Sequence, residues 1–120
     1  MKFNKFKILN AIKEVRNELN LKDIIEDEKG EINLEMFGFC RKASKLLLNK
    51  LKVLGYKNIY IVHGEYINEL IELSGPHIWV ELKSKYILDP TIDQFENPPY
   101  PWITLITNSK YHLKDIELDK

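Results

Sequence analysis

The pattern that most constrains the fold is a run of small and apolar residues at helical spacing between positions 40 and 54. Its members recur every three or four residues: Cys40, Ala43, Ser44, Leu47, Leu48, Leu51 and Leu54. This spacing puts them on one face of an α-helix, with most of the basic residues elsewhere. Gly55 follows the last apolar position, where a C-terminal cap is expected. We therefore predict a helix that begins at Cys40, ends near Gly55 and packs on a sheet.

An earlier segment, residues 4–20, predicts a second amphipathic helix. Apolar residues again recur at helical spacing: Ile8, Ile12, Val15 and Leu19. Residues 22–30 are acidic and end at a glycine, which favours a connector. Residues 33–37 are too short and mixed to assign.

The second half of the chain predicts strands. Residues 58–63 are β-branched and aromatic, and residues 77–82 alternate in polarity. Shorter strands are predicted over 86–89 and 102–107, whereas 65–73 fits helix or strand equally well. Helices followed by antiparallel strands indicate an α+β fold, with the helices packed on one face of the sheet.

Composition limits the classes of function. The 120 residues form one domain of ordinary size, and the 18 basic and 18 acidic residues balance, so the overall charge favours neither nucleic acid nor membranes as partners. A single cysteine excludes an intramolecular disulfide and a multi-cysteine zinc site. No apolar run approaches the ~20 residues of a membrane span, and the N-terminus lacks a signal-peptide pattern. We expect a cytoplasmic protein; abundant Lys, Ile and Asn suggest a bacterial or phage source.

Two other kinds of site are less well supported. The basic face of residues 41–57 lacks interleaved aromatic residues, so a solvated helix face is the better interpretation than an RNA site. His63 and His112 have no partner at metal-ligand spacing, and no phosphate-binding glycine loop occurs. We expect no metal and no cofactor.

Cys40, His77 and Asp89 form the residue set of a cysteine-nucleophile enzyme. A thiolate is favoured at a helix N-terminus beside an imidazolium ion, a histidine can carry the thiol proton, and an aspartate can orient that histidine. Each residue also has an ordinary interpretation. A lone cysteine on an apolar helix face is usually inert, a strand histidine often bonds to backbone, and an aspartate before proline often starts a turn.

Whether His77 and Asp89 can meet depends on the loop between their strands, because strand side chains alternate between faces. A two-residue loop at 83–84 would place Asp89 on the face opposite to His77. A three-residue loop over 82–84 would pair the two residues directly. A loop over 83–85 would make them diagonal neighbours, with Asp89 opposite Trp79. The catalytic interpretation therefore predicts an odd-length loop or a bulge.

The three motifs together, over residues 38–95, resemble the transglutaminase-like core of the papain-like cysteine superfamily. The matching motifs are a cysteine at a helix start, the strand Pro76-His77-Ile78-Trp79-Val80-Glu81-Leu82, and Tyr86-Ile87-Leu88-Asp89-Pro90-Thr91. The chain is similar to small bacterial peptidase-like members. The resemblance implies one domain over 1–120, with an N-terminal helix and connector (1–37) and a catalytic core (38–120).

In this family the matching residues imply Cys40 as nucleophile, His77 as base and Asp89 as orienting acid. The expected activity is hydrolysis or acyl transfer at a peptide or glutamine amide bond, through a thioester, with a protein or peptide as substrate. Asp93 could compete with Asp89. The Cys40 backbone N–H would stabilise the oxyanion. A second donor would come from a side chain, for which Asn33 and Gln94 are candidates, and Trp79 is core packing or a wall of the site. The alternative is a non-catalytic interaction domain that keeps the fold; oligomeric state is not predicted.

Overall fold

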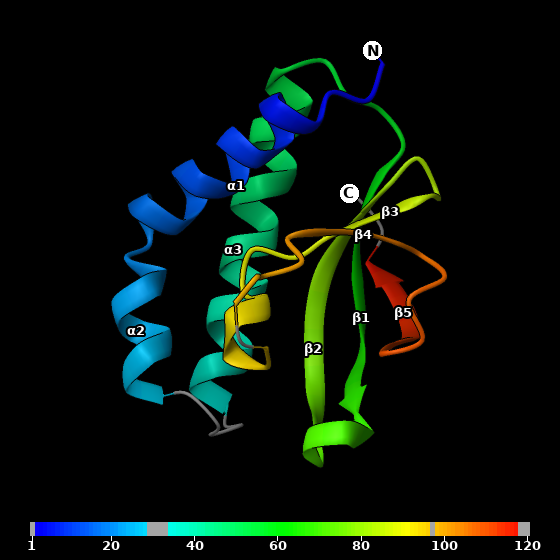
Figure 1. Cartoon of the computed structure of the whole chain (residues 1–120). Helices are drawn as coiled ribbons and strands as arrows, with labels where there is room; N and C mark the ends of the chain where they lie inside the picture. The colour runs from blue at the N-terminus through cyan, green and yellow to red at the C-terminus, as the bar shows by residue number, and fades with distance from the viewer. Residues whose placement is uncertain (1, 29–33, 97, 118–120) are drawn as a thin grey trace.

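Three helices precede five strands in the computed structural model, which describes residues 2–28, 34–96 and 98–117 (Figure 1). The helices are α1 (Lys5–Glu18), α2 (Leu21–Glu28) and α3 (Leu34–Val53). The strands are β1 (Ile59–Asn68), β2 (Leu73–Leu82), β3 (Tyr86–Leu88), β4 (Ile103–Leu105) and β5 (Tyr111–Glu117). Short 3₁₀ turns cover Glu69–Ile71 and Ile92–Gln94. The predicted α+β class is confirmed.

The first helix forms close to where its apolar spacing predicts it. Asn4 caps α1, since its side-chain oxygen accepts a hydrogen bond from the backbone N–H of Lys7 at 3.1 Å. Ile8, Ile12 and Val15 are buried along the face that packs on α3. We predicted that the acidic segment after it is a connector. This prediction is wrong, because Leu21–Glu28 is helical. Leu21 and Ile25, one turn apart, are buried and dock this short helix.

The third helix begins earlier than predicted. It starts at Leu34, so Cys40 is its seventh residue and lies nearly two turns inside the helix. The prediction that Cys40 opens the helix is therefore wrong, and the proposed boundary between 37 and 38 falls within α3. The C-terminal end is as predicted. Gly55 has φ 100°, and the N–H groups of Gly55 and Tyr56 donate to the carbonyls of Lys52 and Leu51, both at 3.0 Å.

The strands form one antiparallel sheet in the order β4-β3-β2-β1-β5. Residues 65–73, left open by the sequence, continue β1 to Asn68, turn, and enter β2 at Leu73. The edge strand β5 was not predicted. It approaches β1 closely at a β-bulge beside Gly64, where an added Cβ would lie 2.1 Å from the carbonyl oxygen of His112. Only glycine fits there, so Gly64 allows β5 to reach its place.

The β2–β3 hairpin has the odd-length loop that the catalytic interpretation requires. Val80 pairs with Leu88 and Leu82 with Tyr86, which leaves a three-residue loop over 83–85. Continuing this register places Asp89 opposite Trp79, on the same face as His77. Lys83 and Ser84 adopt positive φ angles of 57° and 52° to close the loop. Of the three loops considered, the third is confirmed.

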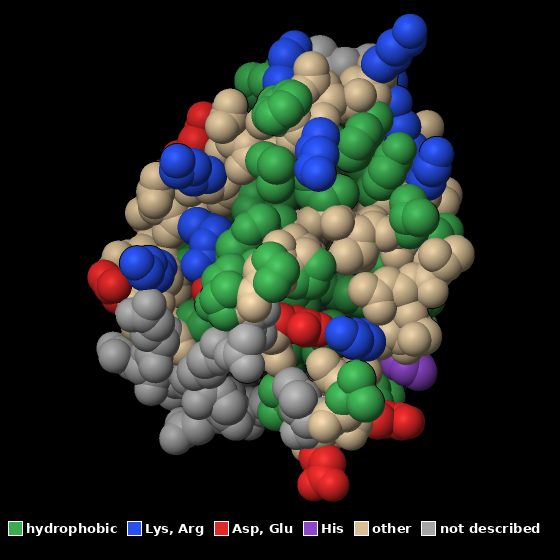
Figure 2. Space-filling model, in the orientation of Figure 1, with side chains coloured by type: hydrophobic (Ala, Val, Ile, Leu, Met, Phe, Trp, Pro, Cys, Tyr) green, Lys and Arg blue, Asp and Glu red, His purple; other side chains and the backbone are tan. Residues whose placement is uncertain are grey.

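Both faces of the sheet carry apolar side chains, but different parts of the chain pack on each face. Ile78, Val80 and Leu82 point from β2 into the main core beneath the helices. Of these helices, α3 contacts β2 directly. His77 and Trp79 point to the other face, where Val62 and Ile87 pack around Trp79. Figure 2 shows apolar side chains gathered between the helical layer and the sheet, with Lys and Arg side chains scattered around them. Among the described residues, no helix is long and apolar enough to span a membrane.

Candidate functional site

His77 and Asp89 form a direct hydrogen-bonded pair. His77 lies on β2, Asp89 follows the end of β3, and the hairpin register brings their side chains to one face. The distance from His77 Nε2 to Asp89 Oδ2 is 2.7 Å, and both side chains are 0% exposed. A buried imidazole and carboxylate this close form a charge-assisted hydrogen bond. One ring nitrogen of His77 is thus held by the acid that the sequence predicted.

Asp89 has a hydrogen-bond partner on each of its oxygens. Oδ1 accepts from the backbone N–H of Thr91 at 3.1 Å, which is the turn expected for an aspartate before Pro90. Oδ2, which bonds to His77, also accepts from the hydroxyl of Tyr111 at 2.7 Å. The turn thus uses Oδ1 of Asp89, and the contact with His77 uses Oδ2. This arrangement fixes the carboxylate relative to the imidazole.

Cys40 reaches the same imidazole from the helical layer. Its side chain hydrogen-bonds to His77, and the Cys40 residue is 1% exposed. One turn further along α3, the Ser44 hydroxyl donates to the carbonyl oxygen of Ile78 at 3.4 Å. That contact ties α3 to β2 at the residue that follows His77. Since Asp89 contacts Nε2, Nδ1 is the ring nitrogen left for other partners.

The neighbours of His77 favour its protonated form. Burial by itself lowers the pKa of His77, because a charged ring is poorly solvated inside the protein. The charge and hydrogen bond of Asp89, together with those of Cys40, outweigh burial and raise the pKa of His77 from its usual 6.5 to about 10. The ring of His77 is therefore held in its protonated form by its contacts with Asp89 and Cys40.

The predicted oxyanion donors fare differently. The backbone N–H of Cys40 lies beyond the first four residues of α3, where helical N–H groups bond to the carbonyl four residues earlier. Its predicted role as an oxyanion donor is therefore wrong in this conformation. The indole N–H of Trp79 points to Glu81 Oε2 at 3.5 Å, and Trp79 is 1% exposed, which makes it core packing beside His77. Asn33 lies outside the described residues.

Gln94 contacts His77 directly. Its side-chain Nε2 lies 2.9 Å from Nδ1 of the ring. In this orientation the amide donates to Nδ1 of a neutral imidazole whose Nε2–H bonds to Asp89. The imidazolium favoured by Asp89 and Cys40 carries a proton on Nδ1, so the amide must turn to present its oxygen. The orientation of Gln94 therefore depends on the protonation state of His77.

Asp93 does not orient His77. Its two carboxylate oxygens accept from Arg16 of α1, at 2.9 Å and 2.6 Å. Burial raises the pKa of the Asp93 carboxyl, and the adjacent Arg16 opposes this by lowering it. The choice between Asp89 and Asp93, left open by the motif, is decided by geometry in favour of Asp89.

Sequence reasoning missed two residues that support the site. Tyr111 comes from β5, whose short alternating pattern was not recognised as a strand, and its ring packs edge-on against Trp79 at 5.0 Å. Arg16 comes from α1, 77 positions before Asp93, and nothing local to either residue marks the pairing. Long-range partners of this kind become visible only once the elements are packed.

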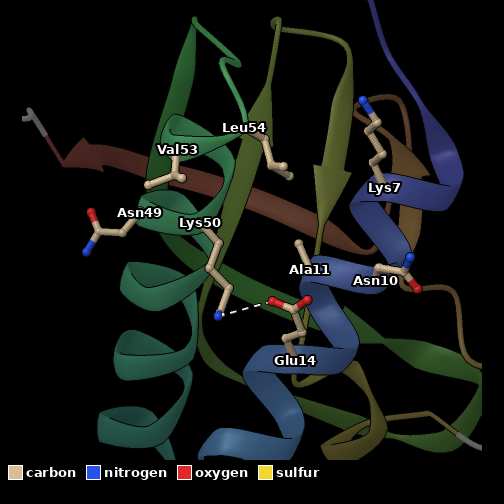
Figure 3. A pocket seen from close by; sticks show the side chains of 8 residues that line it. All are labelled: Lys7, Asn10, Ala11, Glu14, Asn49, Lys50, Val53 and Leu54. Atoms are coloured by element: carbon tan, nitrogen blue, oxygen red, sulfur yellow. Dashed lines mark hydrogen bonds and ion pairs between the residues drawn. The ribbon is translucent and has the colours of Figure 1, made fainter.

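One groove among the described residues lies apart from Cys40, His77 and Asp89. Its volume is about 510 Å³, it lies between α1 and α3, and Lys50 bonds to Glu14 there at 3.2 Å. Figure 3 shows the side chains that line it. None of its lining residues belongs to the Cys40, His77 and Asp89 set. Within the described part of the chain, no group of three or more His, Cys, Asp or Glu side chains is arranged to hold a metal ion.

Comparison with known proteins adds no relative. No protein-family model, curated protein or solved structure matches the chain. Function must therefore be argued from the geometry of the site.

Proposed function

We propose that this protein is a cysteine-dependent hydrolase or acyltransferase that acts on a peptide or glutamine amide bond. The proposal includes a transglutaminase-like core of the papain-like superfamily and a protein or peptide substrate in the cytoplasm. The observation that carries it is the continuous contact from Cys40 to His77 to Asp89, with 2.7 Å between His77 Nε2 and Asp89 Oδ2. Cys40 lies 37 positions before His77, and His77 lies 12 positions before Asp89, yet all three meet at one buried point. The contacts run from nucleophile to base to acid, which is the order that the chemistry needs.

The proposed reaction begins with the thiolate of Cys40 attacking the amide carbon. A tetrahedral intermediate forms and collapses to a thioester, and the leaving amine takes a proton from Nδ1 of His77. Asp89 holds the ring through Nε2 and stabilises its positive charge during both steps. A second nucleophile then gives its proton to His77 and attacks the thioester, which regenerates the thiolate. Water as that nucleophile gives hydrolysis or deamidation, and an amine gives transamidation.

A non-catalytic interaction domain is the second candidate, and one observation favours it. Cys40, His77 and Asp89 are 1%, 0% and 0% exposed, so no substrate reaches them in this conformation. A buried polar network can serve packing alone, provided that its members are satisfied. The contact between Cys40 and His77 is what the catalytic proposal requires, and their burial is what the interaction proposal requires.

Thiol labelling separates the two. The variant His77→Gln keeps a polar side chain of similar size but cannot form an imidazolium. If Cys40 is an activated thiolate, iodoacetamide should label the wild type at pH 6 at least tenfold faster than the variant, with the adduct measured by mass spectrometry. Equal, slow labelling of both proteins would rule out activation by His77.

Activity assays then choose the reaction. Peptide libraries and glutamine-containing peptides, each with and without a primary amine, distinguish cleavage, ammonia release and amine incorporation. Cys40→Ser and Asp89→Asn should lose any activity found, whereas Lys50→Met, at a surface ion pair between α1 and α3, should retain it. Activity that survives Cys40→Ser would exclude the proposed mechanism.

A further inference from the structure

One short segment covers the imidazole of His77. Residues 90–96, called here the closing segment, run from Pro90 through the 3₁₀ turn Ile92–Gln94 to Glu96. Gln94 places its amide 2.9 Å from Nδ1, and the Phe95 ring stands edge-on to the imidazole at 4.9 Å. The closing segment thus approaches Nδ1, the ring nitrogen that Asp89 does not contact. A substrate cannot use Nδ1 until Gln94 leaves it.

The N-terminal helix holds the closing segment through Arg16. Arg16 donates to the carbonyl oxygen of Pro90 at 2.8 Å and to the two carboxylate oxygens of Asp93 at 2.9 Å and 2.6 Å. Its guanidinium also lies 4.5 Å from the ring centre of Trp102. One side chain of α1 therefore makes three hydrogen bonds to the closing segment. The side chains of Arg16 and Asp93 are only 14% and 8% exposed, so solvent screens the pair weakly.

The far end of the closing segment is held by the sheet side of the molecule. Glu96 accepts from Lys110 at 2.8 Å and from the hydroxyl of Tyr66, which stacks on Phe95. In contrast to β3, the closing segment has no strand partner, and side chains keep it in place: the contacts at its two ends and the buried Ile92 and Phe95, which pack with Tyr66. A segment held in this way can open without breaking the sheet.

We propose that the closing segment is the gate of the site and that the Arg16–Asp93 ion pair is its latch. The inference rests on the proposed function, and it names how access to that site is regulated. Opening requires the bidentate pair to break and Gln94 to leave His77, which exposes Nδ1 and Cys40 together. Binding of the substrate, or a shift of α1, would supply the free energy for opening.

The balance at Asp93 supports a latch that can open. Burial raises the pKa of this carboxyl although Arg16 lowers it, so the loss of hydration outweighs the gain from the ion pair. A buried ion pair whose desolvation cost offsets its attraction fixes the positions of its partners but adds little net stability. Such a pair can hold a segment in one position and still release it.

The test measures access to Cys40 under native conditions. A neutral thiol reagent labels the full-length protein across a urea series well below the unfolding midpoint, and the labelling rate gives the free energy of the opening that exposes Cys40. This free energy is compared with that of global unfolding, measured by far-UV circular dichroism. The latch variants are Arg16→Met and Asp93→Asn. Lys50→Met is the matched control because Lys50 joins α1 to α3 instead of to the closing segment.

At equal global stability, both latch variants should label at least tenfold faster than the wild type, and Lys50→Met should label at the wild-type rate. Labelling that follows global unfolding in every variant would overturn the proposal. If neither latch variant folds, Lys110→Met, at the Glu96 end of the closing segment, is compared with the wild type in the same way. Its Cys40 labelling rate should increase about threefold. The same series in the His77→Gln background separates the two proposals. Loss of the latch increases access in both backgrounds, whereas activation of the thiol depends on His77.

Discussion

At the scale of single residues, the site concentrates buried polar groups that a packed core would normally avoid. His77 and Asp89 are fully buried, and each has a partner on both of its polar atoms. An unpaired group at either position would cost on the order of several kcal/mol, so the network is stable only as a complete set. Tyr111 completes it by donating a second hydrogen bond to Asp89 Oδ2.

Removing the hydroxyl of Tyr111 should therefore destabilise the protein. Tyr111→Phe keeps the ring against Trp79 but takes one donor from a buried carboxylate. Hydrogen bonds to charged groups contribute about 1.5–3 kcal/mol, so the free energy of unfolding in urea should fall by roughly that amount. The control is Tyr60→Phe, because Tyr60 is 37% exposed on β1, and a change within about 0.5 kcal/mol is expected there. Equal effects of the two substitutions would contradict the role of Tyr111.

His77 should make stability depend on pH in a stated direction. Its folded-state pKa is raised to about 10, against about 6.5 in the unfolded chain. Between pH 6.5 and 10, the folded state therefore keeps a proton on His77 that the unfolded state has lost. The stabilisation is fully present below about pH 6.5 and is lost as the pH rises toward 10, by an amount on the order of a few kcal/mol.

Two measurements check this pH dependence. The ring protons of His77, assigned by their absence from the His77→Gln spectrum, should show a charged imidazole by NMR through pH 8. Urea unfolding at pH 6.5, 8 and 10 should give a falling free energy in the wild type and a flatter dependence in His77→Gln. A ring that titrates near its ordinary value would mean that Asp89 and Cys40 do not hold the proton.

At the scale of elements, the pairing of His77 with Asp89 depends on the parity of one hairpin loop. The loop over 83–85 has three residues, and a change of one residue would move Asp89 to the other face. Inserting one glycine after Ser84 should therefore break the pairing, whereas inserting two should restore it. The two insertions differ little in loop-closure entropy, about a few tenths of a kcal/mol, so parity is the only large difference.

The readout of the insertions is the labelling of Cys40 at pH 6. The one-glycine variant should lose the activation that His77 gives, and the two-glycine variant should keep at least part of it. Circular dichroism at the same pH ensures that both variants are folded. If both insertions behave alike, the register of the hairpin does not control the site.

The elements also show what sequence could and could not predict. The Gly55 cap and the strand over 77–82 follow from local chemistry, and both were predicted. The hairpin loop was narrowed to three alternatives, one of two residues and two of three residues, because nothing in Lys83-Ser84-Lys85 demands one turn type. The start of α3 was missed because apolar spacing identifies the buried face of a helix better than its first turn. Tyr111 and Arg16 were missed because their partners are 22 and 77 positions away along the chain.

At the scale of the whole molecule, the N-terminal helices belong to the same core as the sheet. The buried side chains of α1 and α2 join those of α3, β1 and β2 in one cluster: Ile8, Ala11, Ile12, Val15, Leu21 and Ile25. Burying an aliphatic side chain of this size contributes about 1.5–3 kcal/mol. The five largest together amount to roughly 10 kcal/mol, which is comparable to the whole stability of a typical domain. We therefore expect the first 28 residues to be required for folding, in addition to the proposed role of Arg16 in the latch.

We expect a fragment of residues 34–120 to be unfolded, as measured by circular dichroism and by the dispersion of its NMR spectrum. In the full chain, Ile12→Ala should cost about 2–5 kcal/mol, while Phe6→Ala on the same helix should cost less than about 0.5 kcal/mol, because Phe6 is 79% exposed. A folded fragment would contradict the single core. It would also lack Arg16, so the latch proposal then requires its Cys40 to label at least as fast as that of the Arg16→Met variant.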